Sequence, residues 1–364
     1  MVNYCLIGCE LYVQIFKRGC LAERDTMAMT EKNMTSSTMT DAKRSTRAEW
    51  NYHPDLPIDN NPLFSWPVRW KEAAMYYHDG WLTLSESSLF IVMATLTYLW
   101  LSPSLEQTTT PDWIWISGIW LRNLIITFLV AGGLHYYFYH HKGQKTELKY
   151  VAPFLSRGER FLFGNQLYDN MFYTLVSGVA IWSAYEAFLF WAMGSGYVSL
   201  VTFRDAPIWT IAALPLISIW ISFHFYFVHR LLHLKPLYEK FHALHHRNVN
   251  VGPFSGISMH PFEHLLYFSS TLIHLLVPTH LMHVIFHFFM LALSAIFGHT
   301  GFDALLVRNA RRLAIGHFHH QLHHRYFECN YGSVDMPWDK WFGSFHDGTP
   351  EARARLKDKL GRRV

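Results

Sequence analysis

Four long apolar segments, separated by short polar ones, occupy the middle of the chain. Each contains close to the roughly 20 residues that an α-helix needs to cross a bilayer. They are residues 88–101, which Trp81 and Leu82 extend, and residues 113–139, 171–193 and 209–228. The second segment contains Arg122 and the third contains Glu186, and ionisable residues inside a span are candidates for a special role. The pattern predicts four transmembrane helices.

A fifth apolar stretch runs from Leu265 to Phe297 and is interrupted at Pro278. It is long for one straight helix at a rise of about 1.5 Å per residue, and it is short for two complete spans. Proline removes a helix hydrogen bond and bends the chain. We therefore predict a bent helical hairpin that enters the bilayer and returns, with Pro278 at its turn.

Basic residues alternate between the loops that connect these segments. The first loop, 102–112, contains no Lys or Arg and the third contains only Arg204, whereas the second contains five and the chain after residue 228 is richly basic. Cytoplasmic loops are enriched in Lys and Arg. Both termini and the chain that follows the fourth span are therefore predicted to be cytoplasmic.

The composition agrees with a membrane protein. Apolar residues make up 51% and charged residues 16% of the chain, against about a quarter charged in soluble domains. The net charge of +4 comes without a basic patch of interleaved aromatic residues, so nucleic acid is not an expected partner. The four cysteines include no CxxC pair, which argues against thiolate zinc and iron–sulfur sites.

The chain divides into four predicted regions. Residues 1–50 are expected to form a largely disordered N-terminal segment, because they are rich in Ser, Thr, Met and charged residues. This segment lacks a basic start and an unbroken apolar core, so a cleaved signal peptide is not expected. Residues 51–200 form the membrane region with the first three spans, residues 201–347 form the region with the candidate chemistry, and residues 348–364 form a basic tail.

Three histidine clusters carry the candidate chemistry. They are His229-Arg-Leu-Leu-His233, His242-Ala-Leu-His245-His246 and His320-Gln-Leu-His323-His324. Residues three and four apart lie on one face of an α-helix, so each cluster can direct two or three ring nitrogens at one point. One metal ion takes about four to six ligands, so eight converging imidazoles indicate two metal ions. The clusters can meet only if the hairpin returns, which places all of them on the cytoplasmic side.

Five further polar residues lie close to these clusters. His299, at the end of the returning arm, is predicted to be another metal ligand. Asp303, one turn later, is a candidate ligand or a hydrogen-bond acceptor for a ligand imidazole. His319 and His224 adjoin the third and first clusters but are expected on other helix faces. His260 precedes the hairpin and is a candidate for contact with the substrate or with a ligand.

The position of the first cluster, where the fourth span ends, suggests a metal site at the mouth of a cavity that a lipid can enter from the bilayer. Zinc has no redox chemistry, whereas iron can reduce O2 and support the oxidation of an unactivated C–H bond. The histidines alone leave both metals open. Rival interpretations are a metal transporter or storage protein, a bis-histidine haem protein around His274 and His287, and an inactive lipid-binding relative. All three interpretations are disfavoured, because the three histidine clusters are complete and lie beyond the ends of the predicted spans.

The clusters, followed by Asn330-Tyr331-Gly332, Trp338-Asp339 and Phe342-Gly343, resemble the fatty acid hydroxylase/sterol desaturase superfamily of membrane di-iron oxygenases. The resemblance covers about residues 186–347. It implies that the eight cluster histidines and His299 bind two iron ions, which zinc can replace in a purified sample. It also implies the use of O2 and of electrons from a separate donor such as cytochrome b5 and its reductase, since no HPGG-type haem-binding stretch occurs. Some hydroxylases of the superfamily have a second histidine where this chain has Asp303.

The expected fold is an all-α integral membrane protein with about four transmembrane helices, a bent helical hairpin and a cytoplasmic helical cap lined by histidines. In a eukaryote the resemblance implies the endoplasmic reticulum. The HxxxH spacing of the first cluster and the tail after His324 are more similar to the sterol-modifying branch, which implies oxidation or desaturation of a sterol or isoprenoid lipid. Squalene epoxidation and fatty acyl or sphingolipid hydroxylation remain open alternatives within the superfamily.

Overall fold

A computed structural model describes residues 50–308 and 310–361. The predicted disorder of residues 1–50 therefore falls, apart from Trp50, outside the described residues. The chain from Trp50 onward forms one compact unit, and the boundaries at residues 200 and 347 remain predictions. The longer helices are α2 (Trp70–Trp81), α3 (Glu86–Trp100), α4 (Trp113–His135), α5 (Gln166–Phe172), α6 (Val179–Gly194), α7 (Pro207–Leu232), α10 (Pro261–Phe268), α11 (Leu281–Gly298), α12 (Phe318–Tyr326) and α14 (Pro350–Gly361).

Short helical segments and one β-hairpin complete the described fold. The short segments are η1 (Pro62–Phe64), η2 (Gln107–Thr109), η3 (Tyr136–His140), η4 (Tyr173–Gly178), α8 (Lys235–Leu237), η5 (Tyr238–His242), α9 (Ala243–His246), η6 (Pro253–Ser255), η7 (Ser269–Leu275) and α13 (Trp338–Trp341). The strands are β1 (His299–Val307) and β2 (Ala310–Gly316).

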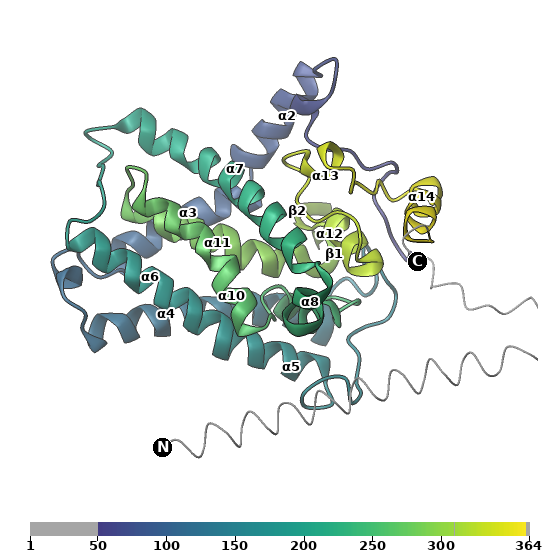
Figure 1. Cartoon of the computed structure of the whole chain (residues 1–364), viewed down its shortest axis with the longest axis horizontal. Coiled ribbons are helices and arrows are strands. Elements are labelled where there is room, and N and C mark those ends of the chain that lie inside the picture. The colour runs from purple at the N-terminus through teal and green to yellow at the C-terminus, as the bar shows by residue number, and fades with distance from the viewer. Residues whose placement is uncertain (1–49, 309, 362–364) are drawn as a thin grey trace, which may run out of the picture. The chain divides into compact units, whose positions relative to one another are not determined.

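Among the described residues, five helical segments are long and apolar enough to cross a membrane. They are Trp70–Trp100, Trp113–His140, Gln166–Gly194, Pro207–Leu232 and Leu281–Gly298. Four of them overlap the predicted spans, the first of which extends one residue beyond Trp100, and the fifth is the returning arm of the predicted hairpin. The helices alternate in direction, so the ends of α4, α7 and α11 that lead toward the histidine clusters lie together at the right of Figure 1. The prediction of a helical integral membrane protein is confirmed.

The outer surfaces of these helices are apolar. Ile114 at the start of α4 and Ile208 at the start of α7 each expose 83% of their surface, and Leu129 and Ile211 expose 65% and 60%. Soluble monomers rarely expose apolar area that is contiguous and large. A lipid environment accommodates such a surface, because the helices satisfy their backbone hydrogen bonds internally.

The predicted hairpin is present, and its two arms differ. The entering arm consists of α10 and η7, and the returning arm is α11, which is the most completely buried span. Pro278 lies in the turn between them, as predicted. α11 packs against α3 and α7, with Phe286, Phe288 and Phe289 fully buried. The hairpin thus fills the centre of the helix bundle and returns the chain to the side where α7 ends.

A buried polar network joins α4 to α6 inside the apolar region. The Arg122 guanidinium donates to Glu186 Oε1 at 2.5 Å, and Asn123 Nδ2 donates to Glu186 Oε2 at 2.9 Å and to Ser183 Oγ at 3.1 Å. Arg122 and Glu186 expose only 6% and 1% of their side chains. Arg122 and Glu186, which lie in different predicted spans, therefore form an ion pair with each other.

The β-hairpin after α11 was not predicted. β1 and β2 pair antiparallel, with Ala304 opposite Ala314, and His299 is both the C-cap of α11 and the first residue of β1. Asp303 was expected one helical turn after His299, but residues 299–307 form a β-strand. The local signal was weak because the strands lack a regular alternation of buried and exposed residues, and β1 follows a long apolar helix directly.

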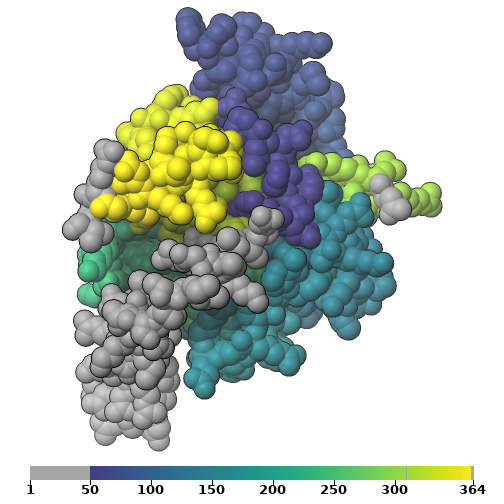
Figure 2. All heavy atoms as spheres, turned by 90° about the vertical axis from the view of Figure 1, so that its right-hand side faces the viewer, coloured from purple at the N-terminus to yellow at the C-terminus, as the bar shows by residue number. Residues whose placement is uncertain are grey.

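The N-terminal part of the described chain lies against its C-terminal part. Ile58 N donates to Asp347 O at 2.9 Å, Asn61 N donates to Val334 O at 3.0 Å, and Asp59 forms an ion pair with Lys340. Figure 2 shows this face, with the purple residues that follow Trp50 beside the yellow C-terminal region. These contacts place the segment before α2 against the chain that follows α12 (Phe318–Tyr326).

Candidate metal centre

Four separate pieces of the chain supply the histidines of the centre. His229 is in the last turn of α7 and His233 is its C-cap. The second cluster occupies η5 and α9, and the third occupies α12. His299 joins them from the end of α11. The nine predicted ligands form two groups in which the nearest ligand atoms all lie within 4.8 Å of one another.

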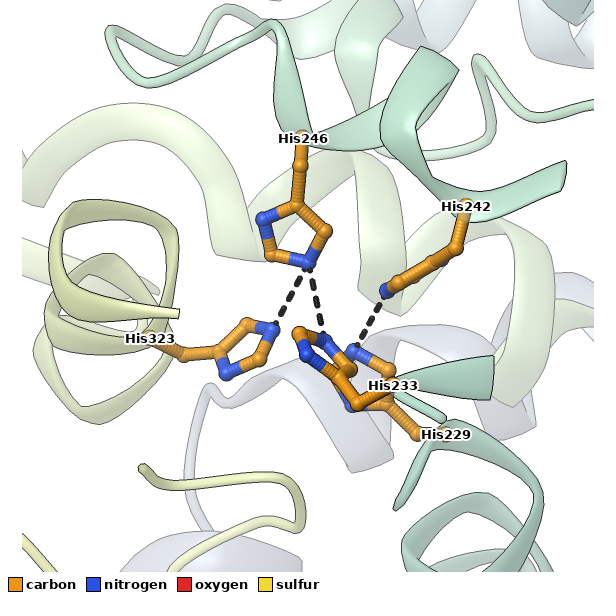
Figure 3. A group of neighbouring side chains, drawn as sticks. All are labelled: His229, His233, His242, His246 and His323. Atoms are coloured by element: carbon orange, nitrogen blue, oxygen red, sulfur yellow. Dashed lines mark hydrogen bonds between the residues drawn. The ribbon is translucent and has the colours of Figure 1, made fainter. Parts of the chain in front are cut away.

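The first group contains His229, His233, His242, His246 and His323. Figure 3 shows their rings converging on one point from three directions. The Nε2 atoms of His229 and His242 are 3.1 Å apart, and His246 Nε2 lies 3.2 Å from His233 Nε2 and 3.0 Å from His323 Nε2. All three clusters contribute to this group.

The second group contains His245, His299, His320 and His324. The Nε2 atoms of His299, His320 and His324 form a triangle with sides of 3.0, 3.1 and 3.2 Å. The His245 ring lies beside it, with its centre 4.7 Å from that of His324. The second and third clusters each divide their histidines between the two groups.

Backbone carbonyls hold the opposite ring nitrogen of three of these histidines at 2.6–2.7 Å. His229 Nδ1 donates to Tyr331 O at 2.7 Å, His323 Nδ1 donates to Cys329 O at 2.6 Å, and His299 Nδ1 donates to Ala295 O at 2.7 Å. A carbonyl only accepts hydrogen bonds, so Nδ1 carries the proton and Nε2 of a neutral ring is a bare lone pair. The same arrangement is common around protein-bound metals, where it orients the ligand ring.

Protons alone do not satisfy the contacts between the Nε2 atoms. In the second group His299 Nε2 has no proton, so His320 and His324 must each donate to it, which leaves two N–H groups facing each other at 3.1 Å. In the first group His246 must donate to the bare His323 Nε2 and then has no lone pair for His233. A cation at the centre of each group accepts all of these lone pairs, so the residues fit a metal ion in each group.

The electrostatic surroundings keep these rings neutral, which is the form that binds metals. Burial, and next to it the charge of neighbouring imidazoles, lowers the pKa of His242, His246 and His323 well below its ordinary value. The same causes lower the pKa of His324. Burial lowers the pKa of His245 to about 4 against the opposing effect of its hydrogen bond to Ser258 O.

Comparison with known proteins agrees with this geometry. Residues 214–344 match the family model described as fatty acid hydroxylase. A Delta(7)-sterol 5(6)-desaturase of Aspergillus fumigatus is 27% identical over 246 residues, which are 65% of this chain and 62% of that protein. A Delta(7)-sterol-C5(6)-desaturase of Nicotiana tabacum is 29% identical over 140 residues, which are 37% of this chain and 50% of that protein. Residues 214–344 therefore belong to the fatty acid hydroxylase/sterol desaturase superfamily.

A third relative extends the similarity beyond the region of the family model. A Delta(7)-sterol 5(6)-desaturase of Gibberella zeae is 23% identical over 324 residues, which are 85% of this chain and 76% of that protein. The chain thus spans between half and about three quarters of the length of these relatives. No solved structure matches the chain.

The tail motif of the superfamily region has a structural explanation. The Asp339 carboxylate accepts the backbone N–H groups of Tyr331 and Gly332 at 2.9 and 2.8 Å. Asn330 has a positive φ of 54°, and its side chain donates to His319 O and His346 O. Asn330 and Asp339 therefore fix the loop whose carbonyls hold His229 and His323, which connects the NYG and WD residues to the two histidine groups.

Glu263 contacts the centre and was not among the predicted site residues. Its Oε1 lies 2.7 Å from His242 Nδ1, and its side chain is 3% exposed. Burial raises the pKa of the Glu263 carboxyl well above its ordinary range, so the two groups share one proton. A carboxylate at the edge of the apolar hairpin was the available signal, but its direction depends on how α10 packs against η5.

Replacing Glu263 is expected to weaken metal binding at the first group. Loss of a carboxylate that orients a ligand histidine typically lowers metal affinity by about 10- to 100-fold, so Glu263→Leu should lose iron at a correspondingly lower chelator concentration. Glu263→Gln should recover part of the affinity, because its amide oxygen can still accept from Nδ1. Iron retained during chelator titration measures the effect, with exposed Glu239→Gln as the control. Equal retention in all variants would contradict the assigned role.

The four secondary candidates lie outside both groups. Asp303 binds Tyr150 OH at 3.1 Å and Arg311 at 2.8 Å, because the chain is a strand there and does not continue as helix after His299. His319 lies 3.7 Å from Asp339 and stacks on Phe345. His260 caps α10 by accepting from Phe262 N. His224 contacts the Ser269 hydroxyl.

A cavity of about 940 Å³ adjoins the histidine groups of the superfamily region. His229, His242, His245, His299 and His320 form part of its wall. Apolar side chains of α7 and α11 form another part; they include Pro215, Ile219, Phe225, Val228 and Met290. The volume falls within the roughly 300–1,000 Å³ of typical small-molecule sites. A lipid-sized apolar molecule can therefore reach both groups.

Proposed function

We propose that this chain is a membrane oxidoreductase that uses O2 to desaturate or hydroxylate a sterol-type lipid, with one iron ion in each histidine group. The observation that supports this proposal most strongly is the pair of histidine groups, members of which line the same cavity as apolar side chains of α7 and α11. The relatives named as Delta(7)-sterol desaturases favour desaturation of a sterol over the other reactions of the superfamily.

Each part of the centre has a role in this proposal. The first iron would be held by His229, His233, His242, His246 and His323, and the second by His245, His299, His320 and His324. Bound iron would supply the activation of O2 that oxidation of an unactivated C–H bond requires. The carbonyls behind Nδ1 orient the rings and keep the proton away from Nε2, and Glu263 holds the proton of His242.

The cavity positions the substrate and limits access of water. Its apolar wall from α7 and α11 matches the hydrocarbon part of a lipid, which gains free energy when it leaves water (about 25 cal/mol per Å² of apolar surface). Exclusion of water from the reacting carbon also suppresses side reactions. Geometry of the bound lipid then decides which C–H bond faces the histidine groups.

The charge distribution supports a cytoplasmic active site, in the endoplasmic reticulum of a eukaryote. The basic second loop and the basic segment after α7 lie at the same end of the helices as the histidine clusters, in accord with the enrichment of Lys and Arg on the cytoplasmic side. Electrons would come from a separate cytoplasmic donor such as cytochrome b5 with its reductase.

Lipid mass spectrometry under 18O2 tests the proposed reaction. Cells whose membranes contain Δ7-sterols and cytochrome b5 would express either the unchanged chain or His245→Ala. We expect the unchanged chain alone to produce a sterol two hydrogens lighter without label, or a sterol with one labelled oxygen if it hydroxylates. Identical sterol profiles in the two cultures, with both proteins present in the membrane and the unchanged chain loaded with iron, would contradict a sterol substrate.

A further inference from the structure

One histidine of the cavity wall belongs to neither metal group. His317 is the N-cap residue of α12, three residues before His320. Its Nε2 lies 3.3 Å from Oε2 of Glu86, the first residue of α3. Both residues line the 940 Å³ cavity. A hydrogen-bonded acid–imidazole pair therefore faces the space that the proposed function assigns to the lipid.

The second ring nitrogen of His317 is available. Among residues 50–308 and 310–361, no hydrogen-bond partner is present for His317 Nδ1, and the side chain is 44% exposed. Gly298 keeps the space beside this nitrogen open, since a Cβ at that position would lie 2.7 Å from Nδ1. Glu86 fixes the ring from one side while Nδ1 remains free to contact a ligand.

The charge of this pair suits a hydroxyl group. Partial burial lowers the pKa of His317, but the hydrogen bond to Glu86 and the charges of Glu86 and Asp335 outweigh this effect, and the net pKa is raised. With the Nε2 proton directed at Glu86, Nδ1 is a donor when the ring is protonated and an acceptor when it is neutral. A hydroxyl both donates and accepts, so it pairs with either form.

The pair lies beside the second metal group. Gly298 directly precedes His299, and His317 is one helical turn before His320. A polar group bound at Nδ1 would hold the carbons a few bonds away close to the ligands of this group. In a steroid, C5 and C6 are separated from the carbon that carries the 3-hydroxyl by two and three bonds.

We propose that His317, oriented by Glu86, binds the hydroxyl group of the lipid substrate and thereby places neighbouring ring carbons beside His245, His299, His320 and His324. This inference rests on the proposed function and specifies the polar end of its substrate. The hydrocarbon end would extend along the apolar wall formed by α7 and α11.

Binding of a Δ7-sterol and of its 3-deoxy analogue, which lacks the hydroxyl, tests the proposal. The full chain would be reconstituted in phosphatidylcholine vesicles, and each compound would compete at equal mole fraction with a radiolabelled Δ7-sterol. The unchanged chain is expected to prefer the alcohol by about tenfold, the usual contribution of one well-placed hydrogen bond. His317→Leu should bind both compounds equally, and His317→Gln should recover part of the preference.

Controls separate this role from others. Glu86→Gln, which leaves His317 in place without its charged partner, should reduce the preference for the alcohol, and exposed His141→Leu should retain it. Each variant must keep the iron content and thermal stability of the unchanged chain to count. A slower turnover of His317→Leu with an unchanged preference for the alcohol would point to proton transfer and overturn the proposal.

The unchanged chain itself distinguishes the two levels of inference. If it binds the alcohol and the deoxy compound equally well, the hydroxyl contact is wrong and the sterol function stands. If it binds neither compound above the vesicle background, the sterol substrate is wrong, and the hydroxyl contact is wrong with it.

Discussion

His323→Ala is expected to abolish turnover and to remove one of two iron ions. His323 belongs to the first group only, and its Nε2 lies 3.0 Å from that of His246. Loss of a direct ligand should exceed the roughly 10- to 100-fold effect of losing a residue that merely orients one. We therefore expect activity to fall by more than about a hundredfold, while iron analysis of the purified chain finds the second group still occupied.

The neighbouring ligand provides a matched comparison. His324→Ala should remove the other ion, because His324 belongs to the second group, although the two residues are adjacent. His141→Ala, a change of the same size at an exposed position, should leave both ions and the activity in place. Full iron content or retained turnover in His323→Ala would show that this histidine is not a ligand.

Glu186→Leu is expected to destabilise the chain by about 3–5 kcal/mol, the usual cost of leaving one member of a buried ion pair without its partner. The Arg122 guanidinium would keep Asn123 Oδ1 and lose the 2.5 Å contact with Glu186 Oε1. Its side chain is only 6% exposed, so water does not replace the lost carboxylate. Denaturant titration in detergent measures the change in unfolding free energy.

The double variant isolates the cause of this loss. Arg122→Met combined with Glu186→Leu removes both charges, and apolar replacement of a complete buried pair is often neutral or stabilising. The double variant should therefore be more stable than Glu186→Leu alone. If the two are equally unstable, the loss comes from packing between α4 and α6, and the interpretation based on the unpaired charge fails.

The helical framework was predictable because lipid imposes a simple rule on the chain. A span must be apolar and about 20 residues long, so each span appeared in the sequence as one continuous stretch. The hairpin was predictable for a related reason, since a 33-residue apolar stretch with Pro278 near its middle fits the bilayer only when it bends. In contrast, β1 and β2 obey no such rule, because neither strand alternates regularly between buried and exposed residues.

The sequence predicted nine histidine ligands, and the structure brings these nine residues together, but the sequence did not predict how they divide between two groups. Adjacent helical residues differ in direction by about 100°, so His245 and His246 point to different groups, as do His323 and His324. That division depends on how α9 and α12 are placed relative to α7. The spacing of histidines along the chain shows which residues share a face of one helix, but it does not show how different helices are placed relative to one another.

Contacts between distant segments were the least predictable part of the site. Glu263 reaches His242 across 21 positions of sequence, and Glu86 reaches His317 across 231. The carbonyls of Cys329 and Tyr331 gave no signal at all, because every residue has a carbonyl group. Such contacts follow from the packing of the whole bundle and become visible only in three dimensions.

The use of main-chain carbonyls behind the ligand rings affects how this centre tolerates sequence drift. Tyr331 O and Cys329 O hold His229 and His323 whatever side chains those two positions carry. These two hydrogen bonds come from the main chain, so they depend on Asp339 and Asn330, which maintain the course of the loop. Substitutions of Asp339 or Asn330 that redirect this short stretch of backbone are therefore expected to cost metal, although neither side chain touches the rings of His229 and His323.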